Sequence, residues 1–349
     1  MKMLELTIGT RTIVLPEIEL CIEYLAKEHA RSILVEFPIG WKCAASQLAK
    51  ALRNALNAKI LVSGKPCWGI CDTCILQENV DAVLHVGHVL TPNLLKVFSS
   101  NTDIRLVDYD EHYSIYSVNS TRTLIAQYAY YLPEQEVLNS LLEQLRTIVD
   151  KDNTVLAYAL PYRLYCEELA QQLGLPYSLV TGCYLPPLHA DKLVVVSSGY
   201  FHALTPLLLG YNNVLLLDID RTRLIPSEDV KKEFTRRLTL KVNALMRAKE
   251  GKTACVLLST KPGQKRIDDA EKALMELENS GISADIVIID DLTDDILQSL
   301  ACDFAVSTMC PRLGFDDLDR FSKPIINIRE LQYVLHSKIS ELDYRKIMH

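Results

Sequence analysis

Three cysteines of this chain stand at the ends of predicted β-strands, where a thiolate could bind a metal. They are Cys71 in WGICD, Cys183 in TGCY and Cys310 in MCPRLGFDD. Thiolates are soft ligands that suit iron–sulfur clusters or zinc. A [4Fe–4S] cluster held by three thiolates leaves one iron open to a substrate, as a catalytic zinc site leaves one position open. Because more than a hundred residues separate each thiol from the next, the three could meet only where three domains join.

A second arrangement of thiols competes with the first. The spacing Cys67-x₃-Cys71-x₂-Cys74 is similar to that of the radical S-adenosylmethionine superfamily, in which one loop supplies all three cluster ligands. It would make Cys183 and Cys310 incidental. The other cysteines are interpreted as small buried hydrophobic residues; they are Cys21, Cys43, Cys166, Cys255 and Cys302. In the cytoplasm, thiols or metal ligands are expected rather than disulfides.

Other polar side chains near predicted strand ends could bind a cofactor. Gln264 lies with Lys261 and Arg266 in a loop that opens a helix, and helix N-termini with adjacent cations bind carboxylates. Arg312 could bind a carboxylate or neutralise a cluster, and His202 could contact a nucleoside or the incoming histidine.

The remaining polar candidates receive structural interpretations. We expect the pair Asp316 and Asp317 to cap a helix or to orient Arg312. His85 and His88 suggest zinc, but a hydrogen-bonded structural pair is favoured because no four-ligand spacing accompanies them.

The elements that must position these residues form a regular pattern. Twelve short runs rich in Val, Ile and Leu alternate with longer amphipathic segments, which is typical of an α/β fold with parallel sheets covered on both faces. The runs fall into three groups of four: 32–37, 59–63, 82–87 and 104–108; 154–158, 177–181, 193–198 and 214–218; 253–259, 284–290, 304–308 and 324–328.

The spacing of these runs is similar in the three groups, which suggests an internal triplication. We therefore predict three similar α/β domains, each a mainly parallel four-stranded sheet with flanking helices. Their predicted bounds are 1–110 with Cys71, 111–220 with Cys183 and 221–349 with Cys310. Polar helices are expected over 132–150 and 226–250, and the segment 329–349 closes the chain.

Composition restricts the possible partners. The chain has 349 residues, 49% of them hydrophobic and 23% charged, with a net charge of −7. Nucleic-acid-binding domains are usually basic, so a nucleic-acid partner is not expected. The sequence contains no apolar run of the length that spans a bilayer and no signal-peptide pattern. We expect a cytoplasmic protein without a membrane partner.

Several phrases together resemble the archaeal diphthamide biosynthesis protein 2 family. The three cysteine phrases occur in the family's order, and other matching phrases accompany them: HVGH at 85–88, SSGYFH at 197–202, LLDID at 216–220 and STKPGQKRIDDAEK at 259–272. The resemblance covers most of residues 30–330 and favours the three-domain site over the single-loop site.

The resemblance implies a homodimer of three similar α/β domains, each supplying one ligand to a [4Fe–4S] cluster. By position these ligands are Cys71, Cys183 and Cys310. It also implies an enzyme that cleaves S-adenosylmethionine between sulfur and the γ-carbon. The 3-amino-3-carboxypropyl radical would add to a histidine of translation elongation factor 2, leaving methylthioadenosine, in the first step of diphthamide formation. An electron donor is required. The family does not need Cys67 or Cys74, which could be spare thiols or alternative ligands.

Two other functions stay open at this point. A conventional radical S-adenosylmethionine enzyme using Cys67, Cys71 and Cys74 would yield 5′-deoxyadenosine instead of methylthioadenosine. A non-catalytic scaffold subunit would hold a structural zinc and would be colourless.

Overall fold

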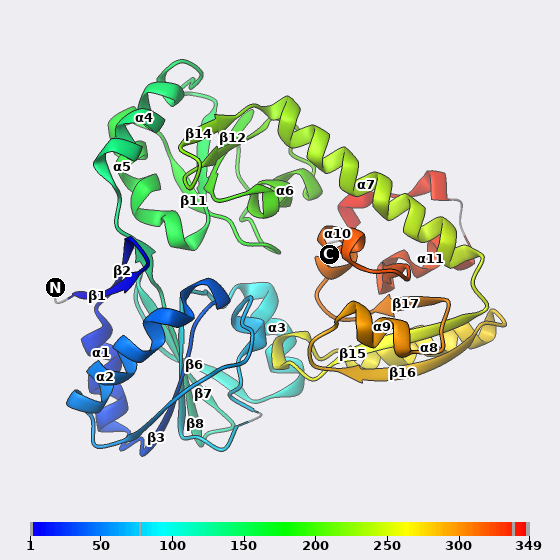
Figure 1. Cartoon of the computed structure of the whole chain (residues 1–349), viewed down its shortest axis with the longest axis horizontal. Coiled ribbons are helices and arrows are strands. Elements are labelled where there is room, and N and C mark those ends of the chain that lie inside the picture. Colours follow the sequence, from blue (N-terminus) through cyan, green and yellow to red (C-terminus); the bar gives the residue numbers. More distant parts are fainter. Residues whose placement is uncertain (1–2, 77, 337–338, 347–349) are drawn as a thin grey trace. The chain divides into compact units, whose positions relative to one another are not determined.

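The computed structural model describes residues 3–76, 78–336 and 339–346. Contacts divide the chain into two compact units. The first unit comprises Met1–Ile148, Tyr158–Leu179 and Lys261–Gly263, and the second comprises Val149–Ala157, Val180–Thr260 and Gln264–His349. Three larger sheets and one small sheet organise the described residues (Figure 1).

The first large sheet is mixed and has the strand order β4-β3-β5-β8-β7-β6. Its strands are β3 (Ser32–Glu36), β4 (Lys59–Val62), β5 (Ala82–Val86), β6 (Ile104–Tyr109), β7 (Tyr113–Val118) and β8 (Arg122–Gln127). The pairs β3–β4, β3–β5 and β5–β8 are parallel, whereas β7 pairs antiparallel with both β6 and β8.

Two apolar cores cover this sheet because its central strands are buried on both faces. Apolar residues of helices α1 (Ile18–Lys27) and α2 (Ala45–Ala55) belong to one core. The other core includes Ile70, Cys74 and Phe98 of α3 (Pro92–Asn101). A small antiparallel sheet adjoins this region in the sequence, with the strands β1 (Met3–Ile8), β2 (Arg11–Pro16) and β9 (Tyr130–Tyr131).

The second large sheet has the order β11-β10-β12-β13-β14. Its strands are β10 (Thr154–Tyr158), β11 (Tyr177–Leu179), β12 (Lys192–Ser197), β13 (Val214–Asp218) and β14 (Arg223–Ile225). β12 and β13 are parallel, and β14 is antiparallel to β13. The helices of this part of the chain are α4 (Gln135–Arg146), α5 (Arg163–Leu173) and α6 (Tyr200–Leu208).

The third large sheet is entirely parallel and has the order β16-β15-β17-β18. Its strands are β15 (Thr253–Ser259), β16 (Ser283–Ile289), β17 (Phe304–Ser307) and β18 (Ile325–Asn327). Its helices are α8 (Ile267–Asn279), α9 (Asp294–Ser299), α10 (Leu313–Asp316) and α11 (Leu331–Leu335). The long helix α7 (Ser227–Lys249) contacts both β13 and β18.

The structure confirms all twelve predicted strands, but it corrects the composition of the sheets. Only the third sheet is a four-stranded parallel sheet. In the first sheet β6 is an edge strand that pairs antiparallel with β7. The strand that pairs in parallel with β5 is β8, which the sequence pattern did not predict. The predicted boundary after residue 110 falls in the turn between β6 and β7.

The three large sheets nevertheless share one arrangement. In each sheet, the strand that comes first in the sequence lies between the second and the third. A further strand then pairs in parallel with the third. In each, the first strand also leads through a 3₁₀ turn into a helix; these turns are Ile39–Ala44, Leu160–Tyr162 and Pro262–Gln264. Internal triplication and the three domain boundaries stay predictions.

Two further expectations concern cysteines and membranes. Cys255 and Cys302 are buried as expected, but they form a disulfide instead of remaining thiols. Their Cα atoms lie 5.8 Å apart because Cys302 lies just before β17, the parallel neighbour of β15. In the described part of the chain, no helix combines the length and the apolar character needed to cross a bilayer.

Candidate functional site

Cys71 lies in the loop that follows β4, in the first unit. The loop contains a short 3₁₀ turn, Ile70–Asp72, and the Cys71 thiol is partly exposed. The Oδ2 atom of Asp72 accepts a hydrogen bond from the backbone N–H of Trp68 at 2.8 Å, and Oδ1 lies 3.5 Å from the Cys71 sulfur. Asp72 therefore closes the loop around Cys71.

Residues 261–263 belong to the same unit and meet this loop. The Nζ atom of Lys261 lies 3.7 Å from Oδ1 of Asp72, and both side chains are buried. Burial raises the pKa of the Asp72 carboxyl, while Lys261 and the Trp68 N–H act against that rise. Gly263 packs on Cys71 so closely that a Cβ atom at Gly263 would lie 2.6 Å from the Cys71 Cα. The predicted loop 261–264 thus begins beside the first predicted cluster ligand.

Cys183 follows β11 in a loop held by hydrogen bonds from a neighbouring helix. The hydroxyl of Thr205, in α6, donates to the carbonyl of Thr181 at 2.9 Å. The Cys183 backbone N–H donates to the Thr181 hydroxyl at 3.4 Å. Burial raises the pKa of the partly exposed Cys183 thiol, although Thr181 and the positive charge of Arg312 lower it in part. A bound cation would overcome the remaining cost of the thiolate.

Cys310 follows β17, at the N-terminal side of the short helix α10. The Thr308 hydroxyl donates to the carbonyl of Leu257 at 2.8 Å, and the Asn327 amide donates to the carbonyl of Pro311 at 3.0 Å. The two neighbouring strands, β15 and β18, thereby hold the residues on either side of Cys310. Its thiol is partly exposed.

The side chain of Arg312 commits all five of its N–H groups. Nε and Nη2 donate to the two carboxylate oxygens of Asp316, the latter bond being 2.9 Å long. Nη1 donates to the Gly182 carbonyl at 2.7 Å and to the Thr205 hydroxyl at 2.9 Å. Nη2 also donates to the Phe201 carbonyl at 2.7 Å, and the guanidinium carbon lies 4.1 Å from the centre of the Phe201 ring. Arg312 is only 3% exposed and joins the loops of Cys310 and Cys183.

This arrangement changes the interpretation of two predicted residues. Arg312 is a buried clamp whose donors are used within the protein, not an open carboxylate receptor. The expectation that Asp316 orients Arg312 is confirmed by its two hydrogen bonds. Asp317 instead pairs with Arg320 at 3.1 Å on the surface.

His202 follows the strand β12, as the sequence pattern predicted, and lies in a helix; Gln264 lies in the turn that opens a helix, also as predicted. His202 is in the first turn of α6, which follows Gly199 at φ 65°, a left-handed conformation that favours glycine. Burial and the positive charge of Arg312 lower the pKa of His202 to about 3, so its imidazole is neutral. Gln264 ends the 3₁₀ turn before α8 and is partly buried.

The thiols of Cys67 and Cys74 face different surroundings from Cys71. Cys67 is buried and its sulfur lies 3.8 Å from Nε2 of His85. Cys74 is part of an apolar core, and burial together with the nearby carboxylate of Glu36 raises its pKa to about 12. This environment argues against a single-loop cluster.

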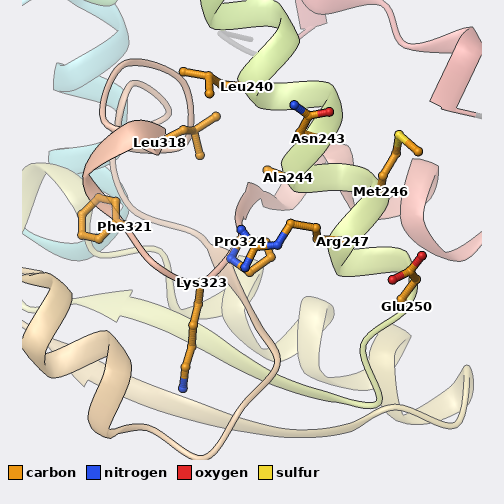
Figure 2. A pocket seen from close by; sticks show the side chains of 10 residues that line it. All are labelled: Leu240, Asn243, Ala244, Met246, Arg247, Glu250, Leu318, Phe321, Lys323 and Pro324. Atoms are coloured by element: carbon orange, nitrogen blue, oxygen red, sulfur yellow. The ribbon is translucent and has the colours of Figure 1, made fainter.

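Two surface pockets lie outside all of these groups. One, of about 500 Å³, lies between α7 and the segment 318–324, as Figure 2 shows. It is lined by Leu240, Asn243, Ala244, Met246, Arg247, Glu250, Leu318, Phe321, Lys323 and Pro324. The other is lined by residues between Glu111 and Tyr177. Neither includes a residue predicted to bind the cluster or the cofactor.

The structure brings some of the predicted residues together. Arg312 lies beside the Cys183 loop and near His202 in the second unit, and Lys261 lies beside the Cys71 loop in the first unit. A common position for Cys71, Cys183 and Cys310 stays a prediction. The sequence pattern did not identify Asp72, Thr205 or Gly263 as supports of these loops, because their roles depend on contacts between distant segments.

Comparisons with known proteins agree with this organisation. Residues 37–345 match the family model described as "Putative diphthamide synthesis protein". A 2-(3-amino-3-carboxypropyl)histidine synthase of Methanocaldococcus jannaschii is 23% identical, with 90% of this chain and 87% of the relative covered. The synthase of Pyrococcus horikoshii is 21% identical, with 92% and 90% covered.

Solved structures show the same fold. Dph2 from Pyrococcus horikoshii with a 4Fe-4S cluster has a TM-score of 0.71 at 20% identity, and the comparison covers 95% of this chain and 93% of that one. A second crystal structure of Dph2 from Pyrococcus horikoshii has a TM-score of 0.70, covering 92% and 91%. The family model spans most of the chain and confirms the resemblance seen in the sequence. The chain therefore belongs to the diphthamide synthesis protein family.

Proposed function

We propose that the protein is a 2-(3-amino-3-carboxypropyl)histidine synthase acting in the first step of diphthamide biosynthesis. It transfers the 3-amino-3-carboxypropyl group of S-adenosylmethionine to a histidine of translation elongation factor 2. The S–Cγ bond breaks and a bond from Cγ to the imidazole C2 forms. Methylthioadenosine leaves, and the radical adduct loses the C2 hydrogen as a proton together with one electron, which balances the electron used for cleavage, so the overall transfer is redox-neutral. The family membership and the names of the two relatives support this proposal.

One structural observation carries the assignment of the cluster ligands. Of the eight free cysteines, only Cys71, Cys183 and Cys310 are partly exposed. The others are buried, except for Cys43, which was expected to be buried but is exposed on the surface. Each of the three lies in a loop after a strand of a different large sheet. Three accessible thiols with soft sulfur donors fit a [4Fe–4S] cluster with one open iron. When bound, that cluster would supply the electron that initiates cleavage of S-adenosylmethionine.

The protein's own residues position the reaction. In this proposal Arg312 holds the Cys183 loop to the residues after Cys310, and Asp72 with Lys261 holds the Cys71 loop. Gln264, at the entrance of α8, contacts the methionine carboxylate of the cofactor. The neutral imidazole of His202 contacts the nucleoside. The working protein is a cytoplasmic homodimer of three-domain chains that takes its electron from a separate donor.

Anaerobic reconstitution with iron and sulfide tests the ligand assignment. Cys71→Ala, Cys183→Ala and Cys310→Ala should each lose most of the bound iron and the visible absorbance. Cys43→Ala is the matched control because its side chain is exposed and lies outside the three loops. Loss of the cluster in Cys67→Ala and Cys74→Ala, with retention in Cys183→Ala and Cys310→Ala, would replace this site with the single-loop site.

Product analysis tests the reaction. After reduction with S-adenosylmethionine under anaerobic conditions, we expect methylthioadenosine as the main nucleoside product. Addition of elongation factor 2 should give a protein carrying the 3-amino-3-carboxypropyl group on one histidine. Mainly 5′-deoxyadenosine would indicate a conventional radical enzyme, and a colourless protein without iron would indicate a scaffold subunit.

A further inference from the structure

A thiol and two imidazoles converge in the first unit, apart from the three predicted cluster ligands. The Cys67 sulfur lies 3.8 Å from Nε2 of His85 and 3.9 Å from Nδ1 of His88. The two nitrogen atoms lie 2.9 Å from each other. The three donor atoms therefore surround one point. The predicted hydrogen-bonded histidine pair is confirmed, but it is part of a larger group.

These separations are close to those around a tetrahedral zinc ion. Zn–N bonds of about 2.05 Å and Zn–S bonds of about 2.3 Å place two nitrogens roughly 3.3 Å apart, and a nitrogen and sulfur roughly 3.6 Å apart. The donor atoms of Cys67, His85 and His88 would each need to move by only a few tenths of an ångström. We propose that Cys67, His85 and His88 bind a zinc ion, with a water molecule as the fourth ligand.

The residue behind His85 supports this assignment. Oε2 of Glu36 lies 2.8 Å from Nδ1 of His85, so Nδ1 carries the proton and the lone pair of Nε2 faces Cys67 and His88. Metal-binding histidines typically donate their second N–H to a carboxylate in this way. Oε1 of Glu36 also accepts a 2.7 Å hydrogen bond from the Cys74 backbone N–H, which fixes the carboxylate.

The backbone brings the two imidazoles to the same point. His85 is in β5 and His88 follows the turn at Gly87, which has φ 83°. A Cβ atom at Gly87 would lie 2.7 Å from the Trp41 ring. Glycine therefore permits both the left-handed turn and the close packing. Cys67 follows β4, and the parallel pairing of β3 with both β4 and β5 brings the two loops to the same sheet edge.

A catalytic triad of Glu36, His85 and Cys67 is the other chemistry that these contacts suggest. His85 is completely buried and Cys67 is 5% exposed, so a substrate could not reach the sulfur. A triad also does not explain why Nδ1 of His88 lies close to both Cys67 and His85. Zinc uses all three donor atoms and releases the proton of the thiol on binding. Held by Cys67, the ion would stabilise the loop that presents Cys71.

Metal analysis of the full-length protein tests the site. We expect about one zinc per chain after dialysis against a weak chelator. Cys67→Ser and His88→Asn should lose it, while the exposed control His189→Asn should retain it. Glu36→Gln should weaken zinc affinity by roughly 10–100-fold. Because zinc is counted separately from iron, Cys71→Ala should lose iron and keep zinc, and Cys67→Ser should do the opposite.

Cobalt provides a readout that does not depend on these variants folding equally well. In full-length protein with Cys71, Cys183 and Cys310 all replaced by alanine, Co²⁺ should give thiolate-to-metal charge transfer and tetrahedral ligand-field bands, and added Zn²⁺ should remove them. Absence of stoichiometric zinc and of these bands would overturn the proposal. So would unchanged zinc binding by Cys67→Ser and His88→Asn. Failure of the three cluster cysteines to bind iron would leave this site unaffected.

Discussion

The Nη1 atom of Arg312 lies 2.7 Å from the carbonyl oxygen of Gly182. Arg312 is two residues beyond Cys310, and Gly182 immediately precedes Cys183, so one hydrogen bond joins the two predicted cluster loops of the second unit. The same guanidinium is fixed by both carboxylate oxygens of Asp316. The planar guanidinium can donate hydrogen bonds to Gly182 and to Asp316 at the same time. Arg312 is therefore a positioning residue.

Replacement of Arg312 by lysine should destabilise the protein while keeping the positive charge. Lysine cannot reproduce the five directed hydrogen bonds, and the partly buried Asp316 carboxylate would lose its bidentate partner. We expect a loss of about 2–4 kcal/mol in the free energy of unfolding. Urea denaturation of the cluster-free protein measures it, and iron retention by Arg312→Lys should also fall.

Arg320→Lys is the matched control for this substitution. Arg320 pairs with Asp317 at 3.1 Å, but its side chain is exposed. Exposed ion pairs contribute little, so the change should stay within about 0.5 kcal/mol. Equal stabilities of Arg312→Lys and Arg320→Lys would contradict the role of Arg312 as a clamp.

Gly263→Ala should disturb the Cys71 loop through direct overlap. The added Cβ would lie 2.6 Å from the Cys71 Cα and 2.7 Å from its Cβ. Because the first of these is a backbone atom, the loop itself must move. Overpacking of this kind typically costs about 1–3 kcal/mol. A lower thermal unfolding midpoint and faster loss of iron from the reconstituted protein should follow.

Gly64→Ala provides the comparison at the start of the same loop. No atom lies within 4 Å of the position its Cβ would take, and its backbone is not in the left-handed region. Its stability and iron retention should therefore match the unmodified protein. If Gly263→Ala behaved like Gly64→Ala, the contact with Cys71 would have no structural importance.

The sequence pattern predicted the existence of strands better than their places in the sheets. The aliphatic run 104–108 correctly indicated a strand, yet β6 is an exposed edge strand and pairs antiparallel. The run RTLIAQ of β8 has too few large aliphatic residues to stand out, although four of its residues are buried in the fourth parallel position. Strand order depends on contacts between segments, which hydrophobic periodicity does not encode.

The same limit applies to the site. Strand-end logic correctly placed Cys71, Cys183 and Cys310 in loops, since loops after parallel strands collect at one edge. It did not identify the acceptors that fix Arg312, because Gly182, Phe201 and Thr205 lie more than a hundred residues away. It also missed Cys67 as a neighbour of the histidine pair. That contact arises because β3 pairs with both β4 and β5.

The buried pair of Lys241 and Glu330 should show strong energetic coupling. Nζ of Lys241 lies 2.6 Å from Oε2 of Glu330, and both side chains are buried. Burial lowers the pKa of Lys241 and raises that of Glu330, while each charge opposes the shift of the other. Lys241→Met leaves a buried carboxylate without its cation, which should cost about 3–5 kcal/mol.

A double-mutant cycle separates the pair from its surroundings. Glu330→Gln removes the charge and keeps an oxygen that can accept the Asn327 backbone N–H, now bonded at 2.7 Å. The double variant Lys241→Met with Glu330→Gln should be destabilised by less than the sum of the single changes. A difference of at least about 1 kcal/mol is expected for contacting buried groups. Additive losses in urea denaturation would show that the two charges do not interact.

His202 should make the stability of the protein depend on pH in the acidic range. Burial and the charge of Arg312 lower its pKa to about 3 in the folded protein, whereas an unfolded histidine titrates near 6.5. Between these values the unfolded chain binds a proton that the folded protein does not, so this group's contribution to stability falls as pH decreases from 6.5 towards 3. Above 6.5 the contribution is complete and does not change.

His202→Gln removes this titration while keeping a neutral polar side chain. The variant should lose less unfolding free energy than the unmodified protein when the pH is lowered through that range. Near neutral pH the difference between the two proteins should be constant, because His202 is uncharged in both states there. Urea denaturation at several pH values measures both curves, and the exposed His189→Gln serves as control. Parallel curves for His202→Gln and the unmodified protein would show that His202 accepts its proton as readily in the folded state as in the unfolded chain.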